Sequence, residues 1–383
     1  MRFATVVWKN ILRRRTRSAL TVSGVAVAVA AVVALVGIAR DFESSALEIY
    51  QRQGTNLVVL RAGTVQWANS VLDERLGQEI ARIEGVRRVS GLLFEMISFD
   101  DYDLFGVMVR GLPPDSFVLE GLELVGPKSR LIRPDDGRVV LLGQRLAEGL
   151  GKTVGDEVKV VEEPFEVIGI FESPNLFESG SMIMPLDQLQ RLQDRKGQVT
   201  LFSVVAERGD RETVEAICRR ITTEIPRLVE YAPSLEARPV QEFVEQAVEL
   251  RLARSVAWLT SAIALVVGTI GMINTMLMAV FERTRELALL RAIGWRKSRV
   301  VRMILLESVL LGVAGAVLGT VGGIVLTRIL SMLPASGRMV AGDISASVVL
   351  QGFAVAMVVG VCGGVYPALR AARLAPTEGL RHE

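Results

Sequence analysis

The chain has 383 residues, a mass of 41.7 kDa and a mean hydropathy of +0.39, and half of its residues are hydrophobic. The net charge is only +2, but charged residues are spread unevenly and long stretches hold none, which is typical of a membrane protein and disfavours a soluble enzyme. The single histidine, His382, and the two cysteines, Cys218 and Cys362, argue against histidine catalysis, a metal site and a disulfide.

The N-terminal segment predicts a membrane anchor. Residues 1–17 hold six basic and no acidic residues, and Phe3, Val7 and Ile11 share one helical face. This pattern predicts a cytoplasmic amphipathic helix, with simple membrane flanking as the alternative. Residues 18–40 form the first predicted transmembrane helix, because about 20 apolar residues cross a hydrocarbon core of about 30 Å. The run is too long for the core of a secretory signal, so we expect an uncleaved anchor.

Residues 41–254 alternate between strand and helix patterns and predict an α+β domain inserted between the first two spans. Residues 41–53 extend the first span as a helix, and residues 240–259 are expected to run as one helix into the second span. These two segments predict helical stalks beneath the α+β domain. Residues 72–86 predict a further helix that ends at Gly85.

Two motifs in this domain resemble ligand sites without meeting their requirements. The GLGKT sequence at residues 149–153 has Leu146 where a phosphate loop needs glycine, so it predicts a turn that ends a helix. Asp100, Asp101 and Asp103 lack the further ligands of a calcium loop and predict a solvated connection between strands.

Three further spans follow the α+β domain. They are assigned to residues 255–281, 303–328 and 344–369, with a loop at 282–302, a link at 329–343 and a tail at 370–383. Glu307 interrupts the third span, and we expect it to reach the interface or to pair with Arg302 or Arg299.

Basic residues predict the orientation of the spans. The loop at 282–302 holds seven basic and two acidic residues, whereas residues 40–254 hold 26 basic and 36 acidic residues. By the positive-inside rule, both termini and this loop are expected in the cytoplasm, and the α+β domain on the opposite side of the membrane. Arginine beside apolar runs therefore indicates membrane flanks and not nucleic-acid binding.

The loop at 282–302 predicts a short helix with a mixed acidic and apolar face, formed by Glu282, Glu286, Leu289, Leu290 and Ile293. The two carboxylates are expected in the first turn, where the helix dipole favours them, and Gly294 is expected to end the helix. Such a face suits docking to a soluble partner, but composition leaves a helix that lies on lipid equally open.

The sequence NTMLMAVFERTRELALLRAIG at residues 274–294 is the most specific part of a longer segment, 270–319. This segment strongly resembles the FtsX-like permease family, of the MacB and LolC/LolE type of ABC transporter subunit. Other segments resemble the first span of that family, the strand after it and its C-terminal signature, at residues 8–30, 54–60 and 366–381. The central region is similar in pattern only, and Gly379 stands where the family usually has alanine.

The resemblance implies that the loop helix is a coupling helix in a groove of a separate cytoplasmic ATPase. ATP and Mg²⁺ would then bind to that ATPase, with no catalytic residue, metal or cofactor on this chain. The residues expected to contact the ATPase are Glu282, Arg283, Glu286, Leu289, Leu290, Arg291, Ile293 and Gly294. The other expected partners are membrane lipid and a second copy or a paralogous permease, with a periplasmic adaptor left open and no nucleic acid.

Small residues in the spans predict close helix packing. In the third and fourth spans we favour packing within the chain over a dimer interface, for Gly315, Gly319, Gly323, Gly360 and Gly364. The resemblance implies that the first two spans make most dimer contacts, and these carry Gly24, Gly268, Gly271 and Asn274.

We therefore predict a permease of the bacterial inner membrane that transmits ATP-driven motion to its external domain and exports or extracts a lipophilic or peptide cargo. No charge lies in the middle of a span, which disfavours a polar path through the helices. Two alternatives stay open: lipoprotein release of the LolC/LolE kind, and FtsX-like signalling that activates a cell-wall hydrolase without transport.

Overall fold

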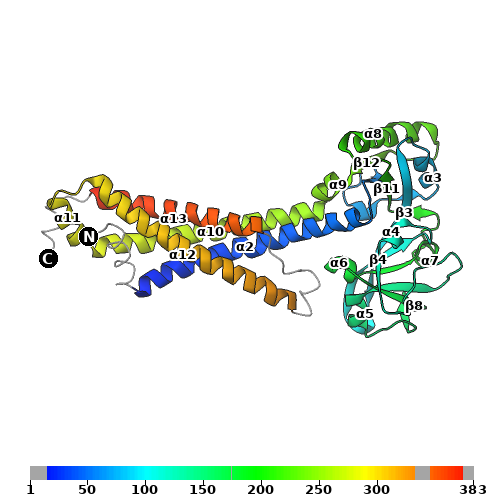
Figure 1. Cartoon of the computed structure of the whole chain (residues 1–383), viewed down its shortest axis with the longest axis horizontal. Coiled ribbons are helices and arrows are strands. Elements are labelled where there is room, and N and C mark those ends of the chain that lie inside the picture. The colour runs from blue at the N-terminus through cyan, green and yellow to red at the C-terminus, as the bar shows by residue number, and fades with distance from the viewer. Residues whose placement is uncertain (1–14, 174, 333–345, 374–383) are drawn as a thin grey trace. The chain divides into compact units, whose positions relative to one another are not determined.

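A computed structural model describes residues 15–173, 175–332 and 346–373 (Figure 1). These residues form two compact units. The helical unit holds residues 15–41, 253–332 and 346–373, and the α+β unit holds residues 42–173 and 175–252. The predicted N-terminal amphipathic helix, the link at 329–343 and the C-terminal tail lie mostly outside the described residues.

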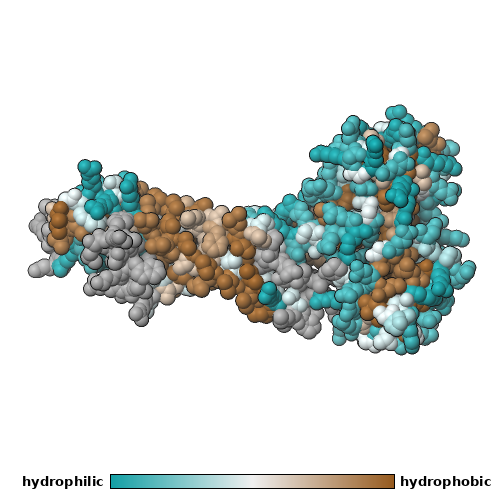
Figure 2. All heavy atoms as spheres, viewed as in Figure 1, coloured by the Kyte–Doolittle hydropathy of each residue, from teal (hydrophilic) through white to brown (hydrophobic). Residues whose placement is uncertain are grey.

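Four long helices make up most of the helical unit: α2 (Arg15–Arg52), α10 (Val248–Glu282), α12 (Lys297–Met332) and α13 (Ala346–Arg373). Each contains a window with a mean hydropathy between 2.1 and 2.6, so each is long and apolar enough to cross a membrane. Hydrophobic side chains cover the visible face of these helices, whereas hydrophilic residues dominate the α+β unit (Figure 2). The uncharged runs thus form helices whose surfaces suit lipid.

The helices of this unit approach each other at glycines. A Cβ atom added to Gly319 of α12 would lie 2.5 Å from the carbonyl oxygen of Ala26 in α2. A Cβ atom on Gly323 would lie 3.1 Å from that of Val33, again in α2. Only glycine permits such close backbone contact, so these small residues set the distance between α2 and α12.

The α+β unit is built on a ten-stranded mixed sheet with the order β12-β1-β11-β3-β4-β9-β6-β8-β5, in which β7 also pairs with β8. Its strands are β1 (Leu57–Arg61), β3 (Val86–Phe99), β4 (Leu104–Leu112), β5 (Glu123–Val125), β6 (Val139–Gly143), β7 (Glu157–Val160), β8 (Glu163–Glu172), β9 (Met182–Pro185), β11 (Leu201–Ala206) and β12 (Leu235–Pro239). Two short strands, β2 (Leu72–Asp73) and β10 (Gln198–Val199), pair separately.

The long strand β3 joins the two parts of this sheet. Its first half, up to Leu92, pairs antiparallel with β11, and its second half, from Leu93, pairs antiparallel with β4. Most other pairs are also antiparallel, but β4 with β9 and β6 with β8 are parallel. Strands β7 and β8 form a hairpin across a two-residue turn in which Val161 and Glu162 have positive φ.

Helices cover the sheet and complete its core. They are α3 (Leu76–Ala81), α4 (Phe117–Glu120), α5 (Gln144–Leu150), α6 (Leu176–Ser179), α7 (Leu186–Leu192), α8 (Arg211–Leu228) and α9 (Val240–Gln246), with short 3-10 turns η1 (Trp67–Asn69) and η2 (Asp100–Tyr102). In α8, Val214, Ile217 and Ile221 recur at helical spacing, are buried and belong to the same core cluster as Phe202 of β11. The prediction of four transmembrane helices with an α+β domain between the first two is therefore confirmed.

Two helices differ from the sequence predictions. The expected helix at 72–86 is shorter, because Leu72 pairs with Val199 in a strand and the Asp73 carboxylate accepts the backbone N–H of Arg75. The expected continuous helix from residue 240 breaks at Ala247, whose ψ of 124° is not helical. The residues before the break belong to the α+β core, where Phe243 and Val244 are buried. No proline or glycine stands at the break, so the sequence pattern did not reveal it.

Candidate functional site

The loop between α10 and α12 forms a helix, α11 (Thr284–Ala292), as predicted. Gly294 follows it with a φ of +103°, a conformation that favours glycine. The N–H of Gly294 donates to the carbonyl of Arg291 at 3.0 Å, and the N–H of Trp295 donates to the carbonyl of Leu290 at 3.1 Å. These two hydrogen bonds form a Schellman motif, a common end of helices, so α11 ends at this glycine as the sequence predicts.

One face of α11 is open to solvent. Glu286, Leu289 and Ile293 follow one another at helical spacing and are exposed, with 54% of Leu289 and 71% of Ile293 accessible. The opposite face is buried, and Leu287 joins the apolar core of the helical unit. An acidic residue followed by two exposed apolar residues on a rigid helix is a suitable contact surface for a protein.

Two residues of the predicted face lie elsewhere. Glu282 is the last residue of α10, so Glu286 is the acidic residue of the first turn of α11. Leu290 is half-buried and contributes little to the exposed face. The helical wheel missed the first fact because the helix breaks at Arg283, so Glu282 and α11 do not belong to one continuous helix.

Arg283 occupies the joint between the two helices. Its guanidinium lies 3.3 Å from a carboxylate oxygen of Glu286 and, through Nη1, 3.3 Å from Oε2 of Glu307. Glu307 is buried in α12, where an ion needs a partner. The expected pairing of Glu307 with Arg302 or Arg299 is wrong: Arg299 instead lies over the ring of Trp295 at 4.5 Å.

Polar contacts also connect this region to the other two spans. Arg17 of α2 donates to Glu282 at 2.9 Å, and Arg291 of α11 donates to the backbone carbonyl of Ala372 in α13 at 3.1 Å. Together with the contact between Arg283 and Glu307, they connect the end of α10 and α11 to α2, α12 and α13. Sequence reasoning could not find these pairs, because up to 265 positions separate the partners.

The glycines of the third and fourth spans pack within the chain, as favoured. A Cβ atom added to Gly315 would lie 2.7 Å from the Cβ atom of Val25 in α2. Gly319 and Gly323 also face α2, and Gly360 and Gly364 face α12 at Val309 and Ser308.

Residues expected at a dimer contact divide into two groups. Gly268 of α10 approaches α2, since its added Cβ atom would lie 3.0 Å from that of Ala28 and 3.7 Å from the carbonyl oxygen of Gly24. These residues therefore pack against each other inside one chain. Gly271 and Asn274 are exposed on α10 and meet no such neighbour within the helical unit.

Two observations bear on metal and nucleotide binding by the described residues. Among residues 15–173, 175–332 and 346–373, no group of three histidine, cysteine or acidic residues could hold a metal ion. The GLGKT segment ends α5, with Gly151 in the left-handed region and Lys152 donating its N–H to Ala147. Leu146, at the first position that a phosphate loop requires as glycine, is buried in the core, so this turn does not fit a nucleotide.

Comparison with known proteins places both units in described families. Residues 18–223 match the MacB-like periplasmic core domain, and residues 258–376 match the FtsX-like permease C-terminal family. The first match covers more than half of the chain.

Relatives resemble nearly the whole chain. An uncharacterized ABC transporter permease of Methanocaldococcus jannaschii is 25% identical over 99% of this chain and 97% of its own length. A macrolide export ATP-binding/permease protein MacB of Nitrobacter winogradskyi is 30% identical over 95% of this chain. The chain spans only 58% of that MacB protein, and 61% of its counterpart in Bdellovibrio bacteriovorus, which is 26% identical.

Solved structures resemble the α+β unit. The periplasmic region of MacB from Actinobacillus actinomycetemcomitans covers 51% of this chain and 94% of its own, with 16% identity and a TM-score of 0.40. The extracellular domain of the noncanonic ABC-type transporter YknZ from Gram-positive bacteria covers 48% and 99%, with 15% identity and a TM-score of 0.39.

Proposed function

Because this chain belongs to the FtsX-like permease family and carries a MacB-like periplasmic core domain, we propose that it is the transmembrane subunit of an ABC transporter. It lies in the bacterial inner membrane and works with a cytoplasmic ATPase on a separate chain. The uncharacterized ABC transporter permease of Methanocaldococcus jannaschii, which is 25% identical over 99% of this chain, supports the role of a permease. ATP and Mg²⁺ bind to the partner ATPase, since the GLGKT turn of this chain does not fit a nucleotide.

The observation that carries this proposal is that α11 exposes one face to solvent while this region also contacts several spans. Its exposed face, with Glu286, Leu289 and Ile293, suits a groove of the ATPase. Arg291 of α11 contacts α13, and the two residues just before α11 contact the other spans: Arg283 pairs with Glu307 of α12, and Glu282 with Arg17 of α2. A force applied to α11 by closure of the ATPase is therefore transmitted to several spans at once.

The α+β domain performs the work on the cargo. It lies in sequence between α2 and α10, so movement of these helices acts on both of its ends. No charged residue lies midway along the four long helices, which supports handling of cargo outside the membrane instead of passage through it. Export or extraction of a lipophilic or peptide cargo by mechanotransmission, in a complex with a second permease copy, is the function that these features support.

A substitution in the exposed face of α11 tests the docking of the ATPase. Leu289→Glu places a charge in the proposed contact and should reduce permease-stimulated ATP hydrolysis by roughly tenfold, which equals about 1.4 kcal/mol. The measurement is ATPase activity of the reconstituted complex, together with co-purification of the ATPase.

The matched control is Leu228→Glu, the same change at an exposed leucine of the α+β unit. This control should leave stimulation and co-purification intact. Full stimulation in a folded Leu289→Glu variant would contradict the assignment of α11 as the coupling helix.

A further inference from the structure

A mainly apolar cavity of about 250 Å³ lies inside the α+β unit. Its walls come from the end of α2, from strands β3, β4 and β11, and from the segment around α9. This volume is close to the lower end of the range of roughly 300–1,000 Å³ that is usual for small-molecule sites. Neither the proposed coupling site nor the uncharged run of α2 includes it.

Aromatic rings form a large part of these walls. The rings of Trp67 and Phe94 are 4.6 Å apart, and Tyr50 packs edge-on against Phe243 at 5.9 Å. Contacts between the rings hold the side chains in place, so the cavity keeps its shape without a ligand. The space suits an apolar chain.

One end of the cavity is polar. Asn175 and Arg110 line it, and they are only 1% and 6% exposed. Nδ2 of Asn175 and Nε of Arg110 have no hydrogen-bond partner within the described ranges 15–173, 175–332 and 346–373. Buried donors are nearly always satisfied, so two such donors beside one cavity point to a missing acceptor.

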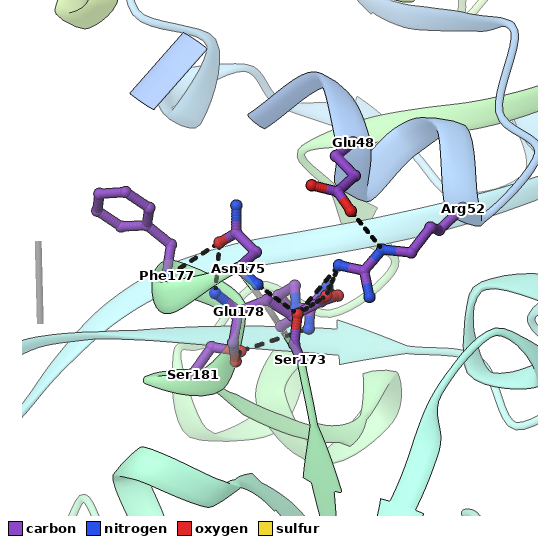
Figure 3. Close-up of polar contacts among 8 residues, drawn as sticks. Glu48, Arg52, Ser173, Asn175, Phe177, Glu178 and Ser181 are labelled. Carbon is purple, nitrogen blue, oxygen red and sulfur yellow. Dashed lines mark hydrogen bonds and ion pairs between the residues drawn. The ribbon is translucent and has the colours of Figure 1, made fainter. Parts of the chain in front are cut away.

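The orientation of the Asn175 amide is fixed by its surroundings. Its Oδ1 atom accepts the backbone N–H groups of Phe177 at 2.9 Å and Glu178 at 3.0 Å, which holds the start of α6. A flipped amide would lose both bonds, so the NH₂ group must point away from α6 (Figure 3).

The charges around this end favour an anion. Glu178 lies 3.2 Å from Arg110 and 3.3 Å from Arg52, so one buried carboxylate serves two guanidinium groups. Glu48 approaches Arg52 only to 4.0 Å and is half exposed. The two guanidinium groups and two carboxylates balance in number, but at the cavity wall Arg110 has, among the described residues, only the carboxylate of Glu178, which it shares with Arg52.

We propose that this cavity binds an amphiphile with an unbranched apolar chain and an anionic headgroup, a free fatty acid or a lysophospholipid. The chain lies among the aromatic rings, and oxygen atoms of the headgroup accept hydrogen bonds from Asn175 Nδ2 and Arg110 Nε. The assignment names a chemical class of cargo, and for that role it rests on the proposed function, but binding itself requires no ATPase.

Photo-crosslinking of the full-length chain in its native membrane tests this site. The probes are a diazirine-bearing dodecanoate and a diazirine-bearing lysophosphatidylglycerol, and mass spectrometry locates the adducts. We expect adducts on β3, β4 and α9, competition by decanoate and none by decyltrimethylammonium. The probe that labels more strongly distinguishes the two sources of the headgroup. Labelling confined to the helical unit, with none on the cavity walls at residues 42–53, β3, β4, β11 or α9, would overturn the proposal.

Asn175→Asp is the sharpest variant, because it keeps the oxygen that holds α6, removes the free donor and adds a negative charge. Labelling of the cavity should fall at least tenfold, whereas Asn69→Asp at an exposed position of the same unit should not change it. If Asn175→Asp does not fold, Ala46→Trp, which fills the cavity from α2, should abolish labelling instead.

Unchanged labelling in a folded variant would overturn the site. Labelling that persists in Leu289→Glu while ATPase stimulation is lost would separate the site from the coupling function. The two proposals can thus fail independently.

Discussion

Glu307 shows how a single buried residue can organise the end of the helical unit that carries α11. A carboxylate in an apolar core is stable only with a close partner, and the structure places Arg283 at 3.3 Å. Arg283 also stands where α10 ends and α11 begins. One ion pair therefore sets the position of the joint relative to α12.

We expect Arg283→Met to destabilise the helical unit by about 3 kcal/mol, because it removes the guanidinium from a buried carboxylate. The double variant Arg283→Met/Glu307→Gln should recover most of this loss, since the neutral amide has a much smaller cost of burial. Thermal unfolding of the purified protein in one detergent measures both effects. A double variant no more stable than Arg283→Met would show that the pair does not act through charge.

At the scale of elements, the packing of α12 against α2 depends on a glycine stripe at one helical spacing. Not every glycine of α12 permits a close contact. A Cβ atom added to Gly319 would meet Ala26 and Val29, whereas one added to Gly322 would meet no atom of the described residues within 4 Å. The two positions are three residues apart in the same span, so they form a matched pair.

Gly319→Ala should therefore lower the stability of the helical unit by about 1–3 kcal/mol, through overpacking against the α2 backbone. Gly322→Ala should be neutral or stabilising by up to about 1 kcal/mol, because alanine is the better helix former. The readout is the midpoint of thermal unfolding in the same detergent. Equal effects of the two substitutions would contradict the observed contact between α2 and α12.

At the scale of the whole molecule, the distribution of basic residues predicts that α11 and the α+β domain lie on opposite sides of the membrane. Single cysteines at Lys297 and Arg208, both exposed, test this topology in a background with Cys362→Ser. Burial raises the pKa of the Cys218 thiol to about 12, so this residue reacts poorly and does not disturb the labelling.

An impermeant maleimide applied to intact spheroplasts should label Arg208→Cys and not Lys297→Cys. After lysis both should react. Labelling of Lys297→Cys before lysis would place the loop outside and remove α11 from reach of any cytoplasmic ATPase.

The local sequence predicted much of the α+β unit as well as the spans. Alternating strand and helix patterns predicted its α+β class and the helix that continues the first span, because periodic burial leaves a periodic pattern of apolar residues. At the candidate site, the structure ends the loop helix at Gly294 and exposes Leu289, as the sequence predicted, but it places Glu282 in α10 and half-buries Leu290. A helical wheel assumes one continuous helix and therefore does not show the break at Arg283.

The sequence by itself determined the four spans and the glycines that pack them, because the cost of burying charge or unpaired backbone in lipid acts on each segment separately. Only the tertiary structure decided which distant groups meet: Arg283 with Glu307, Arg17 with Glu282, and two unsatisfied donors beside an aromatic cavity. Hydropathy is a property of a short window of chain. Which charged groups pair depends on their distance in three dimensions, and a short window of sequence does not show that distance.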